Sequence, residues 1–365
     1  MSDRDAVVVA YDLVSAFGTG AAVCVDGLYA GRSAIARCGR FDTARFRSPF
    51  AAQVDGLDCS HEESILIQML RRLQTASIPR DALPILATTV GEIDLLERGE
   101  ERCTLADTLD RVRVLLGLNE RGVVVSAACA STCAAISRSV SLIRCGVRDA
   151  VVVIAVDIVS EFVFSGFSAL MALADDRARP FDRDRCGLTA GEAAGYVVLM
   201  SAGRARRERR DILACIRGCG QSSDANHMTG PSRDGGGLAR AVRRSLDSAG
   251  LSAADIGFIA AHGTGTTYND AMELKAFKQV FESARPVFSV KGALGHTMGS
   301  AGLVQLVAAI AALERQAVPP TVGLRQVDDD ARGWAGDSDQ TFEGSSAMVV
   351  NAGFGGINAA VVVSV

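Results

Sequence analysis

The sequence has few aromatic residues, no excess of positive charge and no long apolar run. Phe, Trp and Tyr make up 5% of its 365 residues, which argues against an aromatic-lined binding module. The net charge at pH 7 is −4, so there is no electrostatic reason to expect a nucleic-acid or anionic-membrane partner. No apolar run approaches the roughly 20 residues that a membrane-spanning helix needs. These absences point to a globular protein with neither kind of partner.

Signals for secretion and for metal binding are also missing. Residues 1–5 lead directly into an apolar run and lack the basic region and small-residue cleavage site of a signal peptide, so we expect a cytoplasmic protein. The ten cysteines include no CxxC pair, which argues against a structural zinc site or a redox dithiol. In a reducing compartment, most of them should be buried and structural.

Short β-branched runs alternate with helix-like segments, which predicts a layered α/β protein. Because the apolar runs are nearly continuous, we expect sheets buried on both faces and joined by crossover helices. The expected strands are Val7–Val9, Ile85–Val90, Val123–Ser126, Val151–Val156, Tyr196–Met200, Ile212–Ile216, Ile256–Ala260, Val287–Val290, Met348–Asn351 and Ala360–Val363. The expected helices are His61–Gln74, Leu105–Leu116, Ser131–Cys145, Gly237–Ala249, Asp270–Phe281 and Ser300–Arg315.

The chain divides near its middle into two similar halves, residues 1–205 and 206–365. The charged stretch Arg204–Asp211 is expected to be a solvated linker; the alternative is a docking site for an acidic partner. Each half contains a turn rich in Gly, Ala and Ser that opens a long helix of small residues, at Ala127–Cys145 and at Gly292–Leu313. The polar, glycine-rich segment Asp328–Ser346 is expected to be a surface loop.

Cys129 lies where an apolar strand ends and a helix is expected to begin. At that position a thiol faces unpaired backbone N–H groups and the positive end of the helix dipole, which stabilise a thiolate and lower the thiol pKa. Its small neighbours leave room for a long acyl group. The alternative is a buried structural cysteine, a description that suits Cys133 and Cys145 equally well.

Two of the four histidines lie in glycine-rich turns at the edges of expected strands. His262 directly follows an apolar strand, and His296 precedes a long apolar helix. Such turns are where α/β proteins carry catalytic groups. A single loop histidine is more often structural. Two in matching turns, in a chain so poor in histidine, favour a catalytic pair.

Other residues near these turns are candidates for the same site. Asp270 and Glu273 lie one turn apart at a helix start, where carboxylates interact favourably with the dipole; capping and a local ion pair are expected for Asp270. Lys291 lies five residues before His296 and can reach the same site. The glycines of Asn351–Asn358 can aim N–H groups at a ligand, but no helix follows, so a phosphate loop is not expected.

Together these segments resemble the motifs of β-ketoacyl synthases, the elongating condensing enzymes of fatty-acid and polyketide synthesis. The resemblance extends from about Val7 to the end of the chain. It depends on the combination of motifs, because each one alone is weak. The motifs are Ala128–Ser131, Arg179–Asp182, Gly191–Gly195, His262–Thr266, Lys291 with Gly295–His296, and Gly353–Gly356.

The resemblance implies a thiolase-like fold, a five-layered αβαβα structure made of two similar halves and usually dimeric. It implies that Cys129 receives an acyl group from the phosphopantetheine thiol of an acyl carrier protein, with no metal or other cofactor. The backbone N–H groups of Cys129 and Phe354 would form the oxyanion hole, with Phe354 also acting as a gate. His262 and His296 would hold the carbonyl of a malonyl thioester and assist its decarboxylation.

The resemblance also assigns supporting residues. Lys291 and Glu273 would support the two histidines. Thr264 and Thr266 would line the pantetheine channel. The acyl carrier protein is the expected partner, together with either a second copy of the chain or a related ketosynthase-like subunit.

The sequence departs from the family pattern without losing a catalytic group. The part before Cys129 is shorter than usual, in the region that helps to shape the acyl pocket and the dimer contact. Asn269 stands where glycine is usual, and Ala271 where proline is common. Cys186 and Leu188 replace the usual acidic and aromatic residues. These departures favour a specialised secondary-metabolite synthase.

Three functions are weighed at this point. The first is decarboxylative condensation. The second is a non-catalytic chain-length partner of a true synthase; such subunits typically lose the nucleophile, so Cys129 argues against it. The third is acyl transfer or hydrolysis through Cys129 without condensation. Simple transfer needs fewer groups, so the presence of His262, His296 and Lys291 together favours condensation.

Overall fold

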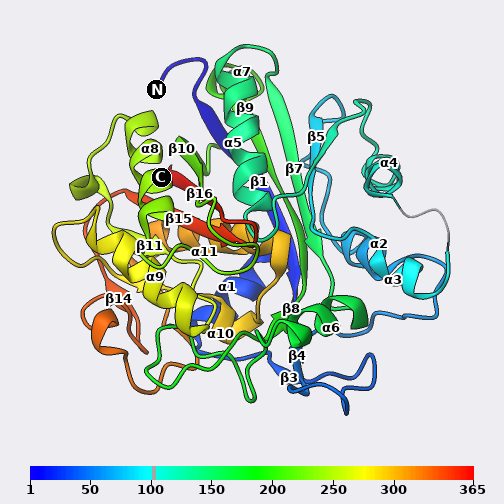
Figure 1. Ribbon diagram of the computed structural model, residues 1–365. Helices are drawn as coiled ribbons and strands as arrows, with labels where there is room; N and C mark the ends of the chain where they lie inside the picture. The colour runs from blue at the N-terminus through cyan, green and yellow to red at the C-terminus, as the bar shows by residue number, and fades with distance from the viewer. Residues whose placement is uncertain (101–103) are drawn as a thin grey trace.

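One large mixed sheet passes through the molecule, and its two halves repeat the same strand order (Figure 1). The computed structural model describes residues 1–100 and 104–365, so Cys103 lies outside the described residues. The first half contains β1 (Ala6–Ser15), β2 (Gly18–Thr19), β5 (Leu83–Ala87), β6 (Val123–Val125), β7 (Ala150–Asp157) and β9 (Ala193–Ser201). The second half contains β10 (Ala214–Ser223), β11 (Phe258–Ala260), β12 (Val287–Phe288), β15 (Ser346–Gly353) and β16 (Ile357–Ser364).

The repeat is visible when the order is followed outward from the central β1–β10 pair. The halves are β1-β9-β7-β5-β6 and β10-β16-β15-β11-β12. Leaving aside the short β2, each half therefore places its first, fifth, fourth, second and third strand in turn. In each half the two outer pairings are parallel and the two inner pairings antiparallel. The pseudo-repeat expected from the sequence is confirmed at the level of topology, whereas the boundary at residues 205 and 206 stays a prediction.

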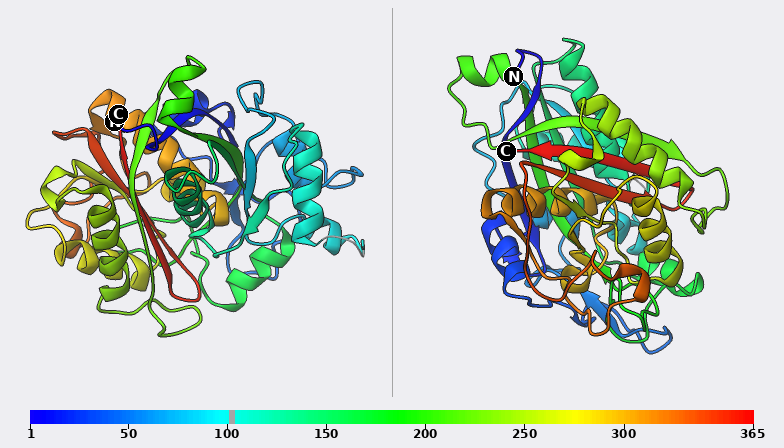
Figure 2. Two further views of the ribbon diagram at one scale, coloured as in Figure 1. Left: turned by 90° about the horizontal axis from the view of Figure 1, so that it is seen from above. Right: turned by 90° about the vertical axis from the view of Figure 1, so that its left-hand side faces the viewer.

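Helices pack between the two halves of the sheet and also cover the outer face of each half, which gives five layers (Figure 2, left). The middle layer consists of α5 (Ser131–Arg144) and α11 (Ala301–Arg315), which lie between the two halves. The outer layers are α2 (Ile65–Leu70), α4 (Leu105–Leu115) and α7 (Ala202–Arg207) on the first half, and α8 (Gly236–Ala249) and α9 (Thr267–Lys278) on the second. The predicted layered α/β architecture is confirmed.

The strands are buried on both faces, as their apolar runs predict. In β7, Val151 and Val153 pack against the middle helices, while Val152 and Ile154 pack against the outer ones. All four side chains are fully buried. Alternation along a strand sends successive side chains to opposite faces, so a continuous Val/Ile run is what a doubly covered strand requires.

Smaller elements complete the fold, and most of them were not expected from the sequence. The remaining helices are α1 (Ala21–Tyr29), α3 (Ile93–Glu97), α6 (Glu161–Ala169), α10 (Lys291–Leu294), η1 (Ala253–Asp255), η2 (Met298–Ser300) and η3 (Asp329–Ala331). The remaining strands are β3 (Ala36–Arg37), β4 (Phe50–Ala52), β8 (Ala190–Gly191), β13 (Ala317–Val318) and β14 (Gln340–Thr341).

Two segments that were expected to lie on the surface are partly helical or buried. The first half of the predicted linker Arg204–Asp211 belongs to α7, where Ala205 is fully buried and Arg204 pairs with Asp81. The predicted loop Asp328–Ser346 contains Trp334, which is 5% exposed and packs against rings of the outer layer. Both segments are polar or glycine-rich overall, but each contains a buried residue, Ala205 or Trp334, that packs against the rest of the fold.

One helical stretch is long and apolar enough to span a membrane by composition, contrary to the sequence expectation. It runs from Met298 to Arg315 with a mean hydropathy of 1.2 over 18 residues. Within the fold, 89% of this stretch is buried, because it forms the middle layer between the two sheet halves. It is therefore a core helix here.

The middle layer requires α5 and α11 to approach closely at Gly302. A Cβ atom at this position would lie 3.0 Å from Cys133 Sγ and from Thr132 Cβ, and 2.8 Å from Asn351 Oδ1. Gly166, in the interior of α6, has no atom within 4 Å of the equivalent position and serves as a matched helical control.

We predict that Gly302→Ala lowers the free energy of unfolding by up to about 2 kcal/mol, because overpacking costs about 1–3 kcal/mol and the helix-propensity gain of about 1 kcal/mol offsets only part of it. Gly166→Ala should instead raise stability slightly. Chemical denaturation of both variants measures the difference. Equal stabilisation by the two substitutions would contradict close packing of α5 against α11 at Gly302.

Candidate active site

The turn between β6 and α5 places Cys129 at the edge of the middle layer. Ala128 adopts φ +49°, a left-handed conformation that costs energy for a residue with a side chain. The hydroxyl of Ser131 closes the turn, accepting from the N–H of Ala127 and donating to the carbonyl of Ala128. Helix α5 begins at Ser131. The sulfur of Cys129 is thereby fixed just before the first turn of the helix.

His262 and His296 reach the same place from the second half of the fold. His262 directly follows β11 and Ala261, while His296 lies between α10 and α11. The backbone of His296 is held by β8, since its N–H donates to Thr189 and its carbonyl accepts from Gly191. A Cβ atom at Gly191 would lie 2.1 Å from the carbonyl oxygen of Leu294, so this contact requires glycine.

The structure brings together the three residues that the sequence analysis proposed as the catalytic centre. Nε2 of His296 lies 3.0 Å from Sγ of Cys129. The two imidazole rings are 5.1 Å apart and nearly perpendicular. One ligand atom from each of Cys129, His262 and His296 lies within 4.8 Å of the other two, a spacing at which a metal ion can also bind. All three side chains are buried.

Lys291 is the positive charge of the site. Its ammonium group is fully buried and donates to the backbone carbonyl of His262. Burial lowers the pKa of Lys291 to about 8, opposed by Glu273. Burial, followed by the charge of Lys291, holds the pKa of both His262 and His296 well below the usual histidine value. Both imidazoles are therefore neutral at physiological pH.

The thiol of Cys129 behaves differently from the sequence expectation. Burial raises its pKa to about 11. Lys291 and the backbone N–H groups of Phe354 and Cys129 act in the opposite direction but do not overcome burial. The predicted lowering of the thiol pKa is therefore wrong for this site, because the sequence position at a helix start does not reveal how completely the sulfur is covered.

Glu273 supports the turn that carries His262. Its two carboxylate oxygens accept from the N–H groups of His262 and Gly263 at 2.7 and 2.6 Å. The side-chain amide of Asn269, at the position where glycine is usual, donates to Glu273 at 2.8 Å and to Asp270 at 3.2 Å. Burial and the neighbouring Asp270 raise the pKa of Glu273 to about 7.

Asp270 holds the next part of the same turn and is fully buried. It accepts hydrogen bonds from the N–H groups of Thr264, Gly265 and Phe181, and Arg185 lies 3.8 Å away as its ion-pair partner. The expected ion pair is therefore not local, because Arg185 is distant in sequence. The N–H groups that Asp270 accepts from belong to the turn before α9 and to Phe181 in another loop. The pKa of Asp270 is raised by burial.

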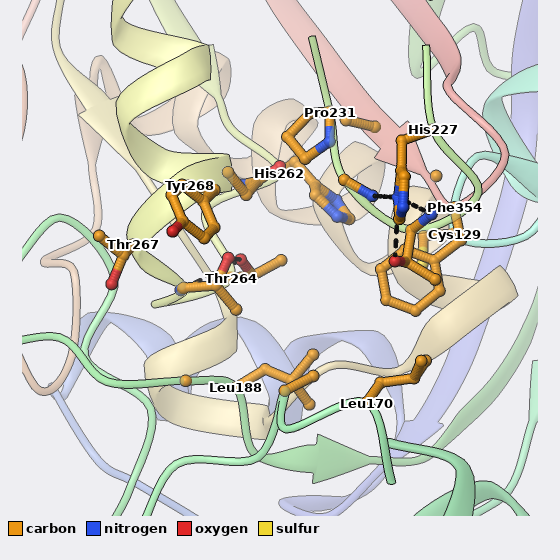
Figure 3. Close-up of a pocket in the computed structure, with 18 of the residues that line it drawn as sticks. Cys129, Leu170, Leu188, His227, Pro231, His262, Thr264, Thr267, Tyr268 and Phe354 are labelled. Carbon is orange, nitrogen blue, oxygen red and sulfur yellow. Dashed lines mark hydrogen bonds between the residues drawn. The ribbon is translucent and has the colours of Figure 1, made fainter. Parts of the chain in front are cut away.

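A cavity of about 890 Å³ leads to the sulfur. Figure 3 shows Phe354 beside Cys129 at one end, with Thr264 and Tyr268 farther along. The hydroxyls of Thr264 and Thr266 lie 2.9 Å apart and face this cavity. Cys186, Leu188 and Asn269, three of the departures from the family pattern, also line it. The cavity connects the buried sulfur with exposed residues such as Tyr268.

Phe354 lies in the turn between β15 and β16, where the glycine-rich segment was expected to aim N–H groups. Its N–H approaches the sulfur of Cys129, as does the N–H of Cys129 itself. Gly353 allows this approach, since a Cβ atom there would lie 3.1 Å from the carbonyl of Ala127. The ring of Phe354 packs edge-on against the ring of Phe167, with 6.2 Å between the ring centroids.

Several residues near the site were missed or undervalued in the sequence. Gln305 and Asn351 form a buried hydrogen-bonded pair behind His262. The available signal for Gln305 was its position as the one polar side chain among residues 301–313 of α11. His227 lies on the rim of the cavity, with Nδ1 accepting from the N–H groups of Thr229 and Gly230; nothing in the sequence distinguished it.

Comparison with known proteins gives consistent matches across the chain. Sequence models of the β-ketoacyl synthase N-terminal and C-terminal domains match residues 110–205 and 213–325. The putative polyketide beta-ketoacyl synthase 1 of Streptomyces halstedii is 31% identical over 416 residues, covering 99% of this chain and 98% of that protein. The 3-oxoacyl-[acyl-carrier-protein] synthase 2 of Vibrio cholerae is 29% identical over 413 residues, covering 99% of both.

A solved structure named the ishigamide ketosynthase/chain length factor has a similar fold. It superposes with a TM-score of 0.89 at 29% identity, covering 100% of this chain and 99% of that one. The thiolase-like architecture expected from the motifs is therefore confirmed. The chain belongs to the β-ketoacyl synthase family of acyltransferases.

Proposed function

We propose that this protein joins an acyl group held on Cys129 to the carbon released when a malonyl thioester loses CO₂. The observation that carries the proposal is the convergence of Cys129, His262 and His296 at the inner end of one cavity. The relatives are named as a 3-oxoacyl-[acyl-carrier-protein] synthase and a putative polyketide beta-ketoacyl synthase, which supports this proposal. We infer the same chemistry here, with both substrates delivered on the phosphopantetheine of an acyl carrier protein.

The first step loads the enzyme. The sulfur of Cys129 attacks the acyl thioester carbonyl, and the oxygen that becomes negative is held by the N–H groups of Cys129 and Phe354. The pantetheine sulfur leaves and takes up the proton that Cys129 gives up, so atoms and charge balance. Phe354, which contacts Phe167 beside the sulfur, is placed to act as the gate.

The second step forms the new bond. Nε2–H groups of His262 and His296 hold the thioester carbonyl of the malonyl substrate while its C–C bond to the carboxylate breaks and CO₂ leaves. The electron pair forms an enolate, whose carbon attacks the acyl group and releases Cys129 as a thiolate that regains a proton from solvent. Each donor to the enolate oxygen is worth about 3 kcal/mol in such reactions.

The supporting roles follow from contacts in the site. Burial, reinforced by the charge of Lys291, keeps both imidazoles neutral, so that each retains a lone pair on one nitrogen and a proton on the other. Glu273 holds the backbone at His262. Thr264 and Thr266 line the cavity through which the pantetheine arm would enter. A cytoplasmic location stays a prediction.

We also propose that the protein works as a dimer, with itself or with a related ketosynthase-like subunit. Among the described residues, no strand pairs with the outer edge of β6, where Val123 is 46% exposed. At the opposite end of the sheet, β12 is covered by the chain itself through the bond from Val287 to Trp334. An uncovered strand edge is a template for pairing with another chain.

For the catalytic roles, we predict that Cys129→Ala abolishes acyl loading, whereas His296→Ala leaves loading measurable and lowers malonyl decarboxylation by about 100-fold, the value of one lost donor. Intact-mass spectrometry with several acyl carrier proteins and malonyl-carrier measures both steps. Equal loss of loading in the two variants would contradict these roles. Acylation without any β-keto product would favour simple transfer, and no acylation with any donor would favour the partner-subunit function.

For the thiol, we predict that alkylation of Cys129 by iodoacetamide accelerates continuously between pH 7 and 9, because a pKa of about 11 keeps the thiolate fraction rising throughout this range. The rise should stay below tenfold per pH unit, because Lys291, with a pKa of about 8, loses the charge that favours the thiolate. Peptide mass mapping separates Cys129 from exposed cysteines such as Cys59. Lys291→Met should slow the reaction further, since it removes a charge that favours the thiolate. A rate that reaches its plateau by pH 7 would contradict the raised pKa.

For the assembly, we predict that light scattering of the purified protein, alone or co-expressed with a related subunit, gives a dimer. Val123→Arg should convert this dimer to monomer, because it places a charge at the exposed strand edge. The control is Val114→Arg, at a more exposed position on α4. A monomer under every condition, or a dimer that tolerates Val123→Arg, would contradict pairing through β6.

A further inference from the structure

The ring of His262 is held at Nδ1 by a side chain rather than by the backbone. Nδ2 of Asn351 lies 3.3 Å from Nδ1 of His262. The ring is neutral, so one nitrogen carries a proton and the other a lone pair. Which nitrogen carries the proton decides whether the face toward the cavity can donate a hydrogen bond. The answer depends on the orientation of the Asn351 amide.

Gln305 fixes that orientation. Its Nε2 contacts three backbone carbonyl oxygens, those of Ala260 at 3.0 Å, Ala261 at 2.7 Å and Val350 at 3.0 Å. Carbonyl oxygens only accept hydrogen bonds, so the amide nitrogen of Gln305 must face them. Its Oε1 therefore faces Asn351 and accepts from Nδ2 at 2.7 Å. A reversed Gln305 amide would place one oxygen against three others.

The other end of the Asn351 amide agrees with this assignment. Sγ of Cys133 lies 3.0 Å from Oδ1 of Asn351, where the thiol donates and the oxygen accepts. The pKa of the Cys133 thiol is raised by burial, so it keeps its proton. The NH₂ group of Asn351 thus donates to Gln305 and to Nδ1 of His262. A lone pair at Nδ1 leaves the ring proton on Nε2.

His296 reaches the same tautomer by another route. The backbone N–H of Met298 donates to its Nδ1 at 3.1 Å, which again leaves the proton on Nε2, next to the sulfur of Cys129. Both rings therefore present N–H groups toward the reacting atoms. In one ring the backbone determines this, and in the other a pair of side chains does.

We propose that Asn351, oriented by Gln305, is a positioning residue that holds His262 in its Nε2–H tautomer, and that decarboxylation depends on this tautomer. The functional part rests on the proposed condensation; the tautomer itself does not. Gln305 and Asn351 are fully buried. Gln305 lies in the apolar helix α11, and its side-chain hydrogen bonds orient this pair, which gives a physical reason for a polar residue there.

The test uses Asn351→Asp, which replaces the donor by an oxygen of the same size. Whether ionised or bonded as an acid to Gln305, that oxygen accepts from Nδ1 and moves the ring proton there. We expect malonyl decarboxylation to fall about 100-fold, as for one lost donor, while acyl loading of Cys129 changes only a few-fold. Loss of loading and decarboxylation to the same degree would indicate a merely structural role and overturn the proposal.

A spectroscopic measurement tests the tautomer independently of activity. The chain has only four histidines, so ¹⁵N-histidine labelling and long-range ¹H–¹⁵N correlation can assign each ring, with His262→Gln identifying its signals. The expected result is an Nε2–H ring in the wild type and an Nδ1–H ring in Asn351→Asp. A wild-type His262 with its proton on Nδ1 overturns the inference.

Two further variants keep the test decisive. Gln305→Met removes the anchor with little change of volume, and we expect mixed tautomers with an intermediate loss of decarboxylation. Cys133→Ser keeps a donor to Oδ1 of Asn351 and should leave the tautomer and both half-reactions nearly unchanged. A wild type that neither loads nor decarboxylates would refute the proposed function, whereas full decarboxylation by both Asn351→Asp and Gln305→Met would refute only the positioning role.

Discussion

The close approach of α5 and α11 is the constraint on which the rest of the molecule depends. These helices bring the turn before α5, with Cys129, next to the turn before α11, with His296, although the two residues are 167 positions apart. Only small side chains allow this distance, as Gly302 shows by its contact with Cys133. The sulfur–imidazole pair is thus a consequence of helix packing in the middle layer. Loops alone would not hold it so closely.

Burial determines the protonation states of the thiol and of the two imidazoles. Covering the thiol and both imidazoles removes the water that would stabilise charge, so the thiol keeps its proton and the rings stay neutral. Lys291 is the buried cation beside them, and its influence favours a thiolate and neutral histidines together. The arrangement suits chemistry in which negative charge develops briefly on a substrate oxygen and is met by fixed N–H groups.

The sequence was sufficient for much of the fold and for predicting which three side chains lie together in the cavity. Continuous Val and Ile runs indicated doubly covered strands, and the matching small-residue helices indicated two similar halves; both are confirmed. The convergence of Cys129 with His262 and His296 was also anticipated from their turns. The thiol pKa was not, because burial is produced by segments distant in sequence. Gln305 and Trp334 show the same limit, since their partners lie in strands and helices that local patterns cannot identify.

The two imidazoles near the sulfur owe their protonation to different parts of the chain. The hydrogen bond to His296 comes from the main chain at residue 298, so it does not depend on the chemistry of that side chain. The φ of +52° most strongly disfavours β-branched residues and proline there. The hydrogen bond to His262 comes from a carboxamide, which one nucleotide change can turn into a carboxylate. One half of the site is therefore robust to mutation and the other is fragile. A lineage could silence decarboxylation, yet keep a folded protein that still accepts acyl groups, by altering residue 351 alone.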